Sequence, residues 1–113
     1  MITPSLTQEI TALHADICSA LADPTRILIL YALSERPKNV SELAEELGIN
    51  QPMASRHLNI LRERGLVMAR REGQSVVNSL VDGRVIEALD ILRAILASNL
   101  KNQAALAGSV TQI

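Results

Sequence analysis

Residues 48–65 read GINQPMASRHLNILRERG, and their order predicts the second half of a helix-turn-helix. Gly48, Ile49 and Asn50 form a connection of about three residues, which is the length that joins two helices at a steep angle. Asn50 can cap the following helix, and Pro52 then falls in its first turn, where the missing N–H of proline does no harm. We therefore expect a helix to begin just after Asn50.

The expected helix has one apolar and one polar side. At about 100° per residue, Ala54, Leu58 and Leu61 fall on one narrow stripe, which would hold the helix to the rest of the domain. The amino-terminal outer surface is left polar and rich in hydrogen-bond donors. Its polar side chains, opposite the stripe or flanking it, are Gln51, Ser55, Arg56, His57, Asn59, Arg62 and Glu63.

Three helices are expected before this one. A helix over about 3–22 starts with Thr3 as cap and Pro4 in its first turn, and it carries an apolar stripe. A second helix starts at Asp23 and Pro24, is apolar nearly all round over 27–33 as a buried helix would be, and is broken by residues 36–38. A third covers about 41–47, with a possible capping box and a glycine stop. The stripe of the first helix is Leu6, Ile10, Leu13, Ile17 and Leu21; the capping box is Asn39 with Glu42, and the stop is Gly48.

After Gly65 the apolar pattern changes from a helical period to a period of two. Residues 66–71 and 76–81 predict two antiparallel strands, joined by turn residues 72–75 at a basic, glycine-containing tip. Asp82 is placed to cap a last helix that would run to about Ala107 before Gly108 ends it. The wide apolar face of that helix is Val85, Ile86, Leu89, Leu92, Ile95, Leu96 and Leu100. A helix-turn-helix followed by a hairpin predicts a winged helix, mainly α with a small β-hairpin.

Composition and charge limit the functions that this fold could have. The 113 residues are 48% hydrophobic and 20% charged, which indicates one globular domain over 1–113 without a linker. Tyr31 is the only aromatic residue, which argues against a protein that grips single strands by stacking bases. The net charge is −1, but residues 51–75 hold five arginines against two glutamates, whereas residues 1–50 hold seven acidic and three basic groups. An anionic partner for the positive segment is therefore expected.

Nothing in the sequence predicts export or membrane insertion. There is no pattern of a signal peptide, and the longest apolar stretch, 27–33, is far too short to cross a bilayer. The single cysteine, Cys18, cannot form a disulfide within one chain, as fits a reducing compartment. We expect a cytoplasmic protein that makes no membrane contact.

Double-stranded DNA is the anionic partner that the winged helix favours. A helix fits the major groove, where arginine and amide side chains can pair with guanine and adenine, while other arginines and serines suit phosphate oxygens. The hairpin tip would reach the backbone or the adjacent minor groove. The predicted DNA-binding residues are Gln51, Ser55, Arg56, His57, Asn59, Arg62, Arg70, Arg71, Gln74 and Ser75. For His57, packing against a neighbouring helix is an equally good interpretation.

The chain also resembles a known family. The resemblance lies in ALADPTRILILYAL (20–33) and VSELAEELGINQPMASRHLNILRERGLVMARREGQ (40–74), followed by a strand and a long helix. Over about residues 10–98, the chain is similar to the ArsR/SmtB family of bacterial winged-helix repressors. The resemblance implies a homodimer formed by the first and last helices (about 3–22 and 82–107), a pseudo-palindromic operator, and repression of its own operon that an inducer relieves. The implied interface residues are Leu6, Ile10, Leu13, Ile17, Leu89, Leu92 and Leu96.

The sequence departs from this family at the metal-sensing positions. The segment 40–47 contains no cysteine, Asp82 is followed two residues later by Arg84, and the last helix has no histidine. We therefore predict no metal site and no cofactor, and the inducer, a small molecule or an oxidant, is unidentified. His14 and Cys18 are four residues apart, but the simpler interpretation is a buried, unreactive cysteine beside a surface or interface histidine. Tyr31 and Met53 are expected to fill core space, although an apolar pocket near Tyr31 could hold an organic inducer.

The sequence leaves two other classes of function to be compared with DNA binding. A winged helix used only for protein–protein contact is the alternative, since a fold does not fix a function, but such a module has no need for five arginines in one segment. An enzyme is a distant third, because no nucleophile set, phosphate loop or acid pair has a usable spacing.

Overall fold

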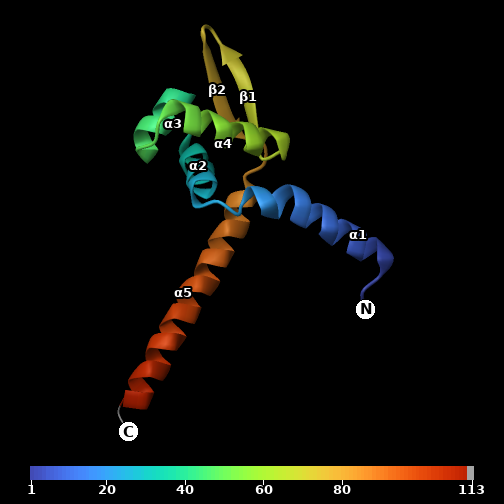
Figure 1. Ribbon diagram of the computed structural model, residues 1–113, viewed down its shortest axis with the longest axis vertical. Helices are drawn as coiled ribbons and strands as arrows, with labels where there is room; N and C mark the ends of the chain where they lie inside the picture. Colours follow the sequence, from blue (N-terminus) through green and yellow to red (C-terminus); the bar gives the residue numbers. More distant parts are fainter. Residues whose placement is uncertain (112–113) are drawn as a thin grey trace. The chain divides into compact units, whose positions relative to one another are not determined.

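The computed structural model describes the backbone of residues 1–111 and the side chains of residues 1–108. The elements are α1 (Pro4–Leu13), a π-helical segment η1 (His14–Cys18), α2 (Pro24–Glu35), α3 (Val40–Leu47), α4 (Gln51–Glu63), β1 (Val67–Glu72), β2 (Ser75–Leu80) and α5 (Arg84–Thr111) (Figure 1). They form two compact units that divide between Asp82 and Gly83. The first unit holds a helix-turn-helix followed by a hairpin, so the predicted winged helix is confirmed.

Side-chain caps fix the helix starts where the sequence places them. Asp23 Oδ1 accepts from the backbone N–H of Thr25 at 2.7 Å, and Asn50 Oδ1 accepts from that of Met53 at 2.8 Å. Burial alone would raise the pKa of Asp23, but the backbone N–H groups of Thr25 and Arg26 donate to its carboxylate and hold the pKa below its usual value. Each cap satisfies an N–H that the first helical turn leaves without a partner. Thr3 caps α1 in the same way.

The core of the first unit is aliphatic and lies where α2, α3 and α4 meet the hairpin. Ile29, Leu30, Leu43, Ala54, Leu58 and Leu61 are almost fully buried. The predicted stripe of α4 is thus confirmed as its buried face. Gly48, at φ +67°, ends α3 in the left-handed conformation that favours glycine, and this allows the short turn into α4.

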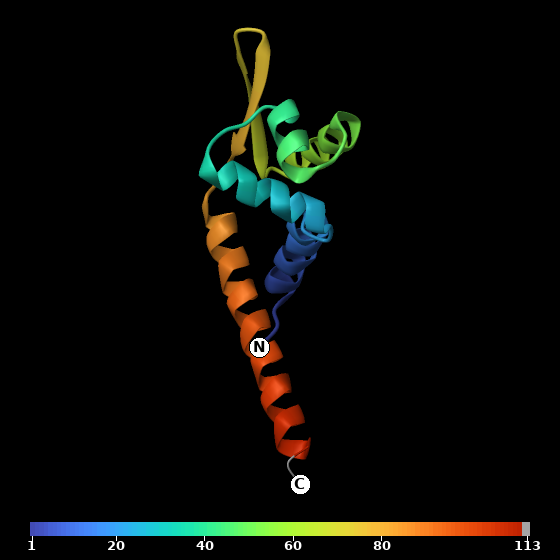
Figure 2. The ribbon, with the colours of Figure 1, turned by 90° about the vertical axis from the view of Figure 1, so that its left-hand side faces the viewer.

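The hairpin has a tighter turn than its sequence predicts. Its strands pair from Val67 with Leu80 to Glu72 with Ser75, so only Gly73 and Gln74 connect them. Gly73 has a φ of +62°, whereas Gln74, like every other non-glycine residue that the structure describes, has no positive φ. This combination fits a type II′ turn with glycine at its first central position. Glu72 and Ser75 therefore belong to the strands, and not to a four-residue turn. The hairpin projects as a ribbon beyond α2, α3 and α4 (Figures 1 and 2).

The first helix differs from expectation at its end. After Leu13 the helix continues through the π-helical segment, in which the backbone N–H of Ser19 donates to the carbonyl of His14. Cys18 is exposed, so its expected burial is wrong; His14 is also exposed, as predicted for a surface residue. No residue of α1 is buried, and Ile10 and Leu13 keep 50% and 41% of their surface accessible.

The last helix is longer than predicted. It begins at Arg84, two residues after the expected cap Asp82, and it continues through Gly108 to Thr111. The stop at Gly108 is wrong because a glycine inside a helix costs only about 1 kcal/mol and neither proline nor a turn sequence follows it. Leu92, Ile95, Leu96 and Leu100 on this helix are each more than half exposed, whereas Leu89 is buried. Among the described helices, none is both long enough and apolar enough to span a membrane.

Acid should unfold the protein partly by breaking the capping box of α3. The carboxylate of Glu42 accepts a hydrogen bond from the backbone N–H of Asn39 at 3.1 Å and another from Arg36 at 2.6 Å. Both bonds lower the pKa of Glu42, and the bond from Asn39 lowers it more. A carboxyl whose pKa is lower in the folded state stabilises the fold above its unfolded pKa of about 4.3, and this contribution is lost as the pH falls through the folded pKa. In pH-dependent urea unfolding, Glu42→Gln should therefore lose stability less steeply than wild type below about pH 5.

The matched control for this experiment is Glu45→Gln. Glu45 is exposed on the same helix, and its carboxylate makes no hydrogen bond or ion pair within the described part of the chain. Its replacement should leave the steep loss of stability in place. Identical pH profiles for Glu42→Gln and wild type would contradict the role given to Glu42.

Candidate nucleic-acid interface

The outer surface of α4 carries a free cation at its amino-terminal half. Arg56 is exposed, and no hydrogen bond or ion pair holds it in the region that the structure describes. Gln51 is exposed as well, but its side-chain amide donates to the hydroxyl of Ser41 at 2.9 Å and so links α4 to α3. Ser55 is half-buried one residue before Arg56. Arg56 is therefore the predicted base-reading residue with the greatest freedom to reach a ligand.

Arg62 is directed by two neutral amides. Its guanidinium donates to Oδ1 of Asn78 at 3.2 Å and to Oδ1 of Asn59, one turn earlier on α4. Asn59 is exposed, Arg62 is half-buried, and Asn78 is only 2% exposed. These bonds connect the carboxyl-terminal half of α4 to the base of the hairpin, and Asn59 supports Arg62 in this structure.

The two arginines of the hairpin lie on opposite faces. Arg70 is exposed and paired with Glu72 two residues later, while the guanidinium of Arg71 makes no hydrogen bond or ion pair in the described chain. Because paired residues of antiparallel strands share a face, Arg71 lies with Val76 and Asn78 on the face toward α4. Arg70 is on the other face. Gln74 and Ser75 are exposed at the tip, as predicted.

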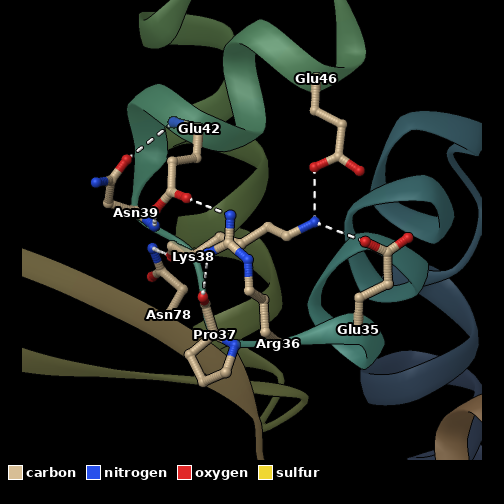
Figure 3. A network of polar contacts seen from close by, with 8 residues as sticks. All are labelled: Glu35, Arg36, Pro37, Lys38, Asn39, Glu42, Glu46 and Asn78. Carbon is tan, nitrogen blue, oxygen red and sulfur yellow. Dashed lines mark hydrogen bonds and ion pairs between the residues drawn. The ribbon is translucent and has the colours of Figure 1, made fainter.

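A buried polar network at the base of the hairpin is absent from the sequence predictions (Figure 3). Lys38 and Asn78 exchange backbone hydrogen bonds of 3.0 and 2.8 Å, and Nδ2 of Asn78 donates to the carbonyl of Lys38 at 3.2 Å. Nζ of Lys38 reaches Glu46 at 2.7 Å and Glu35 at 3.1 Å. The bond to Glu46 outweighs the burial of Lys38 and raises its pKa. The network ties the hairpin to α2 and α3.

The one signal for this network in the sequence is a polar residue at an inward position of a strand. Asn78 interrupts the apolar run of β2 on the side that turns to the core. A buried amide needs partners, so this position marks a hydrogen-bonding centre. The partner Lys38, 40 residues earlier, cannot be found by pattern alone.

His57, a predicted DNA-binding residue, and Arg64, one of the five arginines of residues 51–75, both have partners within the fold. His57 is half-buried, and its Nδ1 lies 3.4 Å from a guanidinium nitrogen of Arg26, which also donates to the carbonyls of Ser19 and Ala20. The packing interpretation of His57 is thus the one that the structure supports. Arg64 donates to the carbonyl of Ala15 at 2.8 Å and ties the end of α4 to η1.

The charge of the segment 51–75 is therefore not all available to a ligand. Arg64 is committed to a structural contact and Arg70 to Glu72. Arg56, Arg62 and Arg71 have no carboxylate partner in the described residues. They leave uncompensated positive charge on α4 and on the hairpin face next to it, which suits an anionic ligand.

No metal site competes with this interpretation in the residues that the structure covers. Among the described side chains, no group of three or more His, Cys, Asp or Glu is close enough to hold a metal ion. His14 and Cys18 therefore gain no further ligands from their surroundings within the described chain.

Comparisons with known proteins agree with this geometry. A family model described as bacterial regulatory protein, arsR family, matches residues 23–69. The HTH-type transcriptional regulator NmtR of Mycobacterium tuberculosis is 41% identical over 85 residues, covering 75% of this chain and 71% of that protein. A probable mercury resistance operon repressor of Streptomyces lividans is 36% identical, covering 82% and 78%.

A solved structure shares the architecture. The homodimeric winged helix-turn-helix DNA-binding domain of a possible ArsR-family transcriptional regulator from Mycobacterium bovis superposes with a TM-score of 0.76 at 26% identity. The match covers 89% of this chain and 93% of that domain. The similarity therefore extends beyond the residues that the family model matches.

Proposed function

The chain belongs to the arsR family of bacterial regulatory proteins, and from that premise we propose that it is a homodimeric repressor that binds a pseudo-palindromic operator in its own promoter region. Its relatives are transcriptional regulators with a winged helix-turn-helix fold, and not enzymes. In the proposal, α4 enters the major groove and reads bases through Arg56, while the hairpin contacts the backbone through Arg71.

The observation that carries this proposal is the placement of Arg56, Arg62 and Arg71. These cations lie on α4 and on the hairpin face beside it, and none is neutralised by a carboxylate of the described chain. A winged helix that served only protein contacts would have no need of this arrangement, so the protein-interaction alternative is not favoured. Gln51, Ser55, Asn59, Gln74 and Ser75 supply further polar groups on the same surfaces.

Dimerisation would use apolar side chains that a single chain leaves exposed. Ile10 and Leu13 on α1, and Leu92 and Leu96 on α5, are between 41% and 58% exposed. Leu6 and Ile17 are half-buried, and Leu89 is buried already. Burial of such side chains is favourable by about 25 cal/mol per Å². The solved relative from Mycobacterium bovis is a homodimer, which supports the proposed assembly.

Release from DNA is proposed to depend on an inducer outside the metal classes. The segment 40–47 has no cysteine and α5 has no histidine, so the metal sites implied by the family resemblance lack their ligands. The inducer would be a small molecule or an oxidant acting on Cys18, which is exposed. Fluorescence anisotropy with labelled promoter DNA would test binding, and adding candidate inducers to the bound complex would test release.

Replacing Arg71 by alanine should weaken binding to every duplex. Arg71 has no competing carboxylate and lies on the hairpin, where phosphate is the expected contact, so its loss removes a sequence-independent interaction. The slope of the logarithm of the DNA-binding constant against the logarithm of salt concentration should fall in magnitude by about 0.9. The loss of affinity should be similar on operator and scrambled DNA. A loss confined to the operator would contradict this role, and titrations of both DNAs over a salt series would distinguish the two.

A further inference from the structure

A cleft of about 320 Å³ lies between α4 and β2. Its apolar walls include Leu58 and Val76, and its polar lining comes from Ser55, Asn59, Arg62 and Asn78. The volume is at the lower end of the range for small-ligand sites, about 300 to 1,000 Å³. The cleft opens beside the same α4 residues that are proposed to face DNA.

The polar groups that line this cleft are mainly donors. The oxygens of Asn59 and Asn78 already accept from the guanidinium of Arg62, which leaves the amide N–H groups of Asn59, the hydroxyl of Ser55 and the remaining N–H groups of Arg62. No carboxylate among the described residues lines the cleft. A half-buried guanidinium held only by neutral acceptors keeps its full charge, so the chemistry selects an anion with several acceptor oxygens.

The guanidinium is also held in a fixed direction. Asn78 cannot turn away, because its Nδ2 donates to the carbonyl of Lys38 and its backbone exchanges two hydrogen bonds with the same residue. Lys38 is only 3% exposed and is anchored in turn by Glu35 and Glu46 (Figure 3). A donor set that is oriented before the ligand arrives loses less freedom on binding.

We propose that this cleft is a preformed seat for one phosphate group, with Arg62 as the contacting residue and Asn78 as the buried residue that positions it. The phosphate of a DNA backbone and a free inorganic phosphate present the same acceptor oxygens. If the bound phosphate belongs to a DNA backbone, this proposal rests on the proposed function. Asn78 is then a positioning residue that acts on the ligand only through Arg62.

The first test follows the Nε–Hε signal of Arg62 by NMR in the full chain, titrated separately with inorganic phosphate and with duplex DNA. A saturable shift with duplex alone assigns the seat to the DNA backbone. A saturable shift with inorganic phosphate, together with competition against DNA, assigns it to a free anion. If neither titrant moves the signal, the seat does not exist. If no duplex binds at all, the proposed function fails, and the phosphate titration alone decides the seat.

The second test asks whether Asn78 acts through Arg62. Arg62→Gln should reduce the magnitude of the salt slope of DNA binding by about 0.9, and Arg93→Gln, an equal charge change in α5, is the matched control. Introduced into the wild-type protein, Asn78→Leu should lower the affinity for DNA. Introduced into the Arg62→Gln variant, the same substitution should change the affinity for DNA by less than about two-fold. Equal losses in both backgrounds would overturn the positioning role.

A variant that keeps the shape of Asn78 guards against a folding defect in Asn78→Leu. Asn78→Asp retains an oxygen that accepts from Arg62, although it loses the hydrogen bond from Nδ2 to the carbonyl of Lys38, and its carboxylate would neutralise the guanidinium. The protein should fold, as measured by circular dichroism, and the Arg62 signal should no longer respond to either titrant. An undiminished response in folded Asn78→Asp would also overturn the proposal.

Discussion

Arg56→Ala is expected to weaken binding to the operator by about 1 to 3 kcal/mol, while binding to scrambled DNA falls much less. The reason is that Arg56 is exposed on α4 with no partner in the described chain, so its guanidinium is free to make paired hydrogen bonds with a guanine edge. Such a contact exists only where the correct base is present. The measurement is a pair of anisotropy titrations at one salt concentration.

The matched control for Arg56 is Arg70→Ala, on the hairpin face away from α4. It removes the same charge from an exposed site that is already paired with Glu72, so the operator and scrambled DNA should respond alike. If Arg56→Ala also lost equal affinity on both DNAs, Arg56 would be a phosphate contact and the base-reading role would be wrong. Bases would then have to be read by other α4 residues, such as Gln51.

Leu58→Ala should lower the free energy of unfolding by about 2 to 5 kcal/mol. Leu58 is 2% exposed on the buried stripe of α4, so truncation removes apolar burial and leaves a cavity under the helix. Chemical denaturation followed by circular dichroism would measure the change. Because α4 keeps its outer residues, the folded variant should still discriminate between operator and scrambled DNA at low temperature.

Leu28→Ala is the matched control for this loss. It makes the same truncation on α2, at a side chain that is 53% exposed, and should change the free energy of unfolding by less than about 1 kcal/mol. Equal destabilisation by the two substitutions would mean that Leu58 is not part of the core. The packing of α4 against α2 would then need revision.

Local signals predicted most of the fold. The caps Thr3, Asp23, Asn39 and Asn50 lie where polar side chains precede helical runs, and the apolar stripe of α4 follows directly from the helical period. The errors lie where local signals are weak. A glycine near the end of α5 does not stop that helix, and no pattern marks the π-helical segment.

The site could be predicted only as a set of residue types. The sequence places arginines on α4 and the hairpin, but it cannot show which of them find partners within the protein. Arg64 is held by the carbonyl of Ala15, 49 residues away, and Arg62 by Asn78, 16 residues away. Such partners depend on tertiary packing, which brings distant segments together, and they decide which charges remain for DNA.

Sequence-specific binding of DNA by this chain can be tested in a single experiment. Fluorescence anisotropy of the purified protein would compare labelled DNA from upstream of its own gene with scrambled DNA over a salt series. We expect tight, selective binding to the upstream DNA, with a steep loss of affinity as salt rises. Equal binding to both DNAs by a confirmed dimer, or none to either, would contradict it.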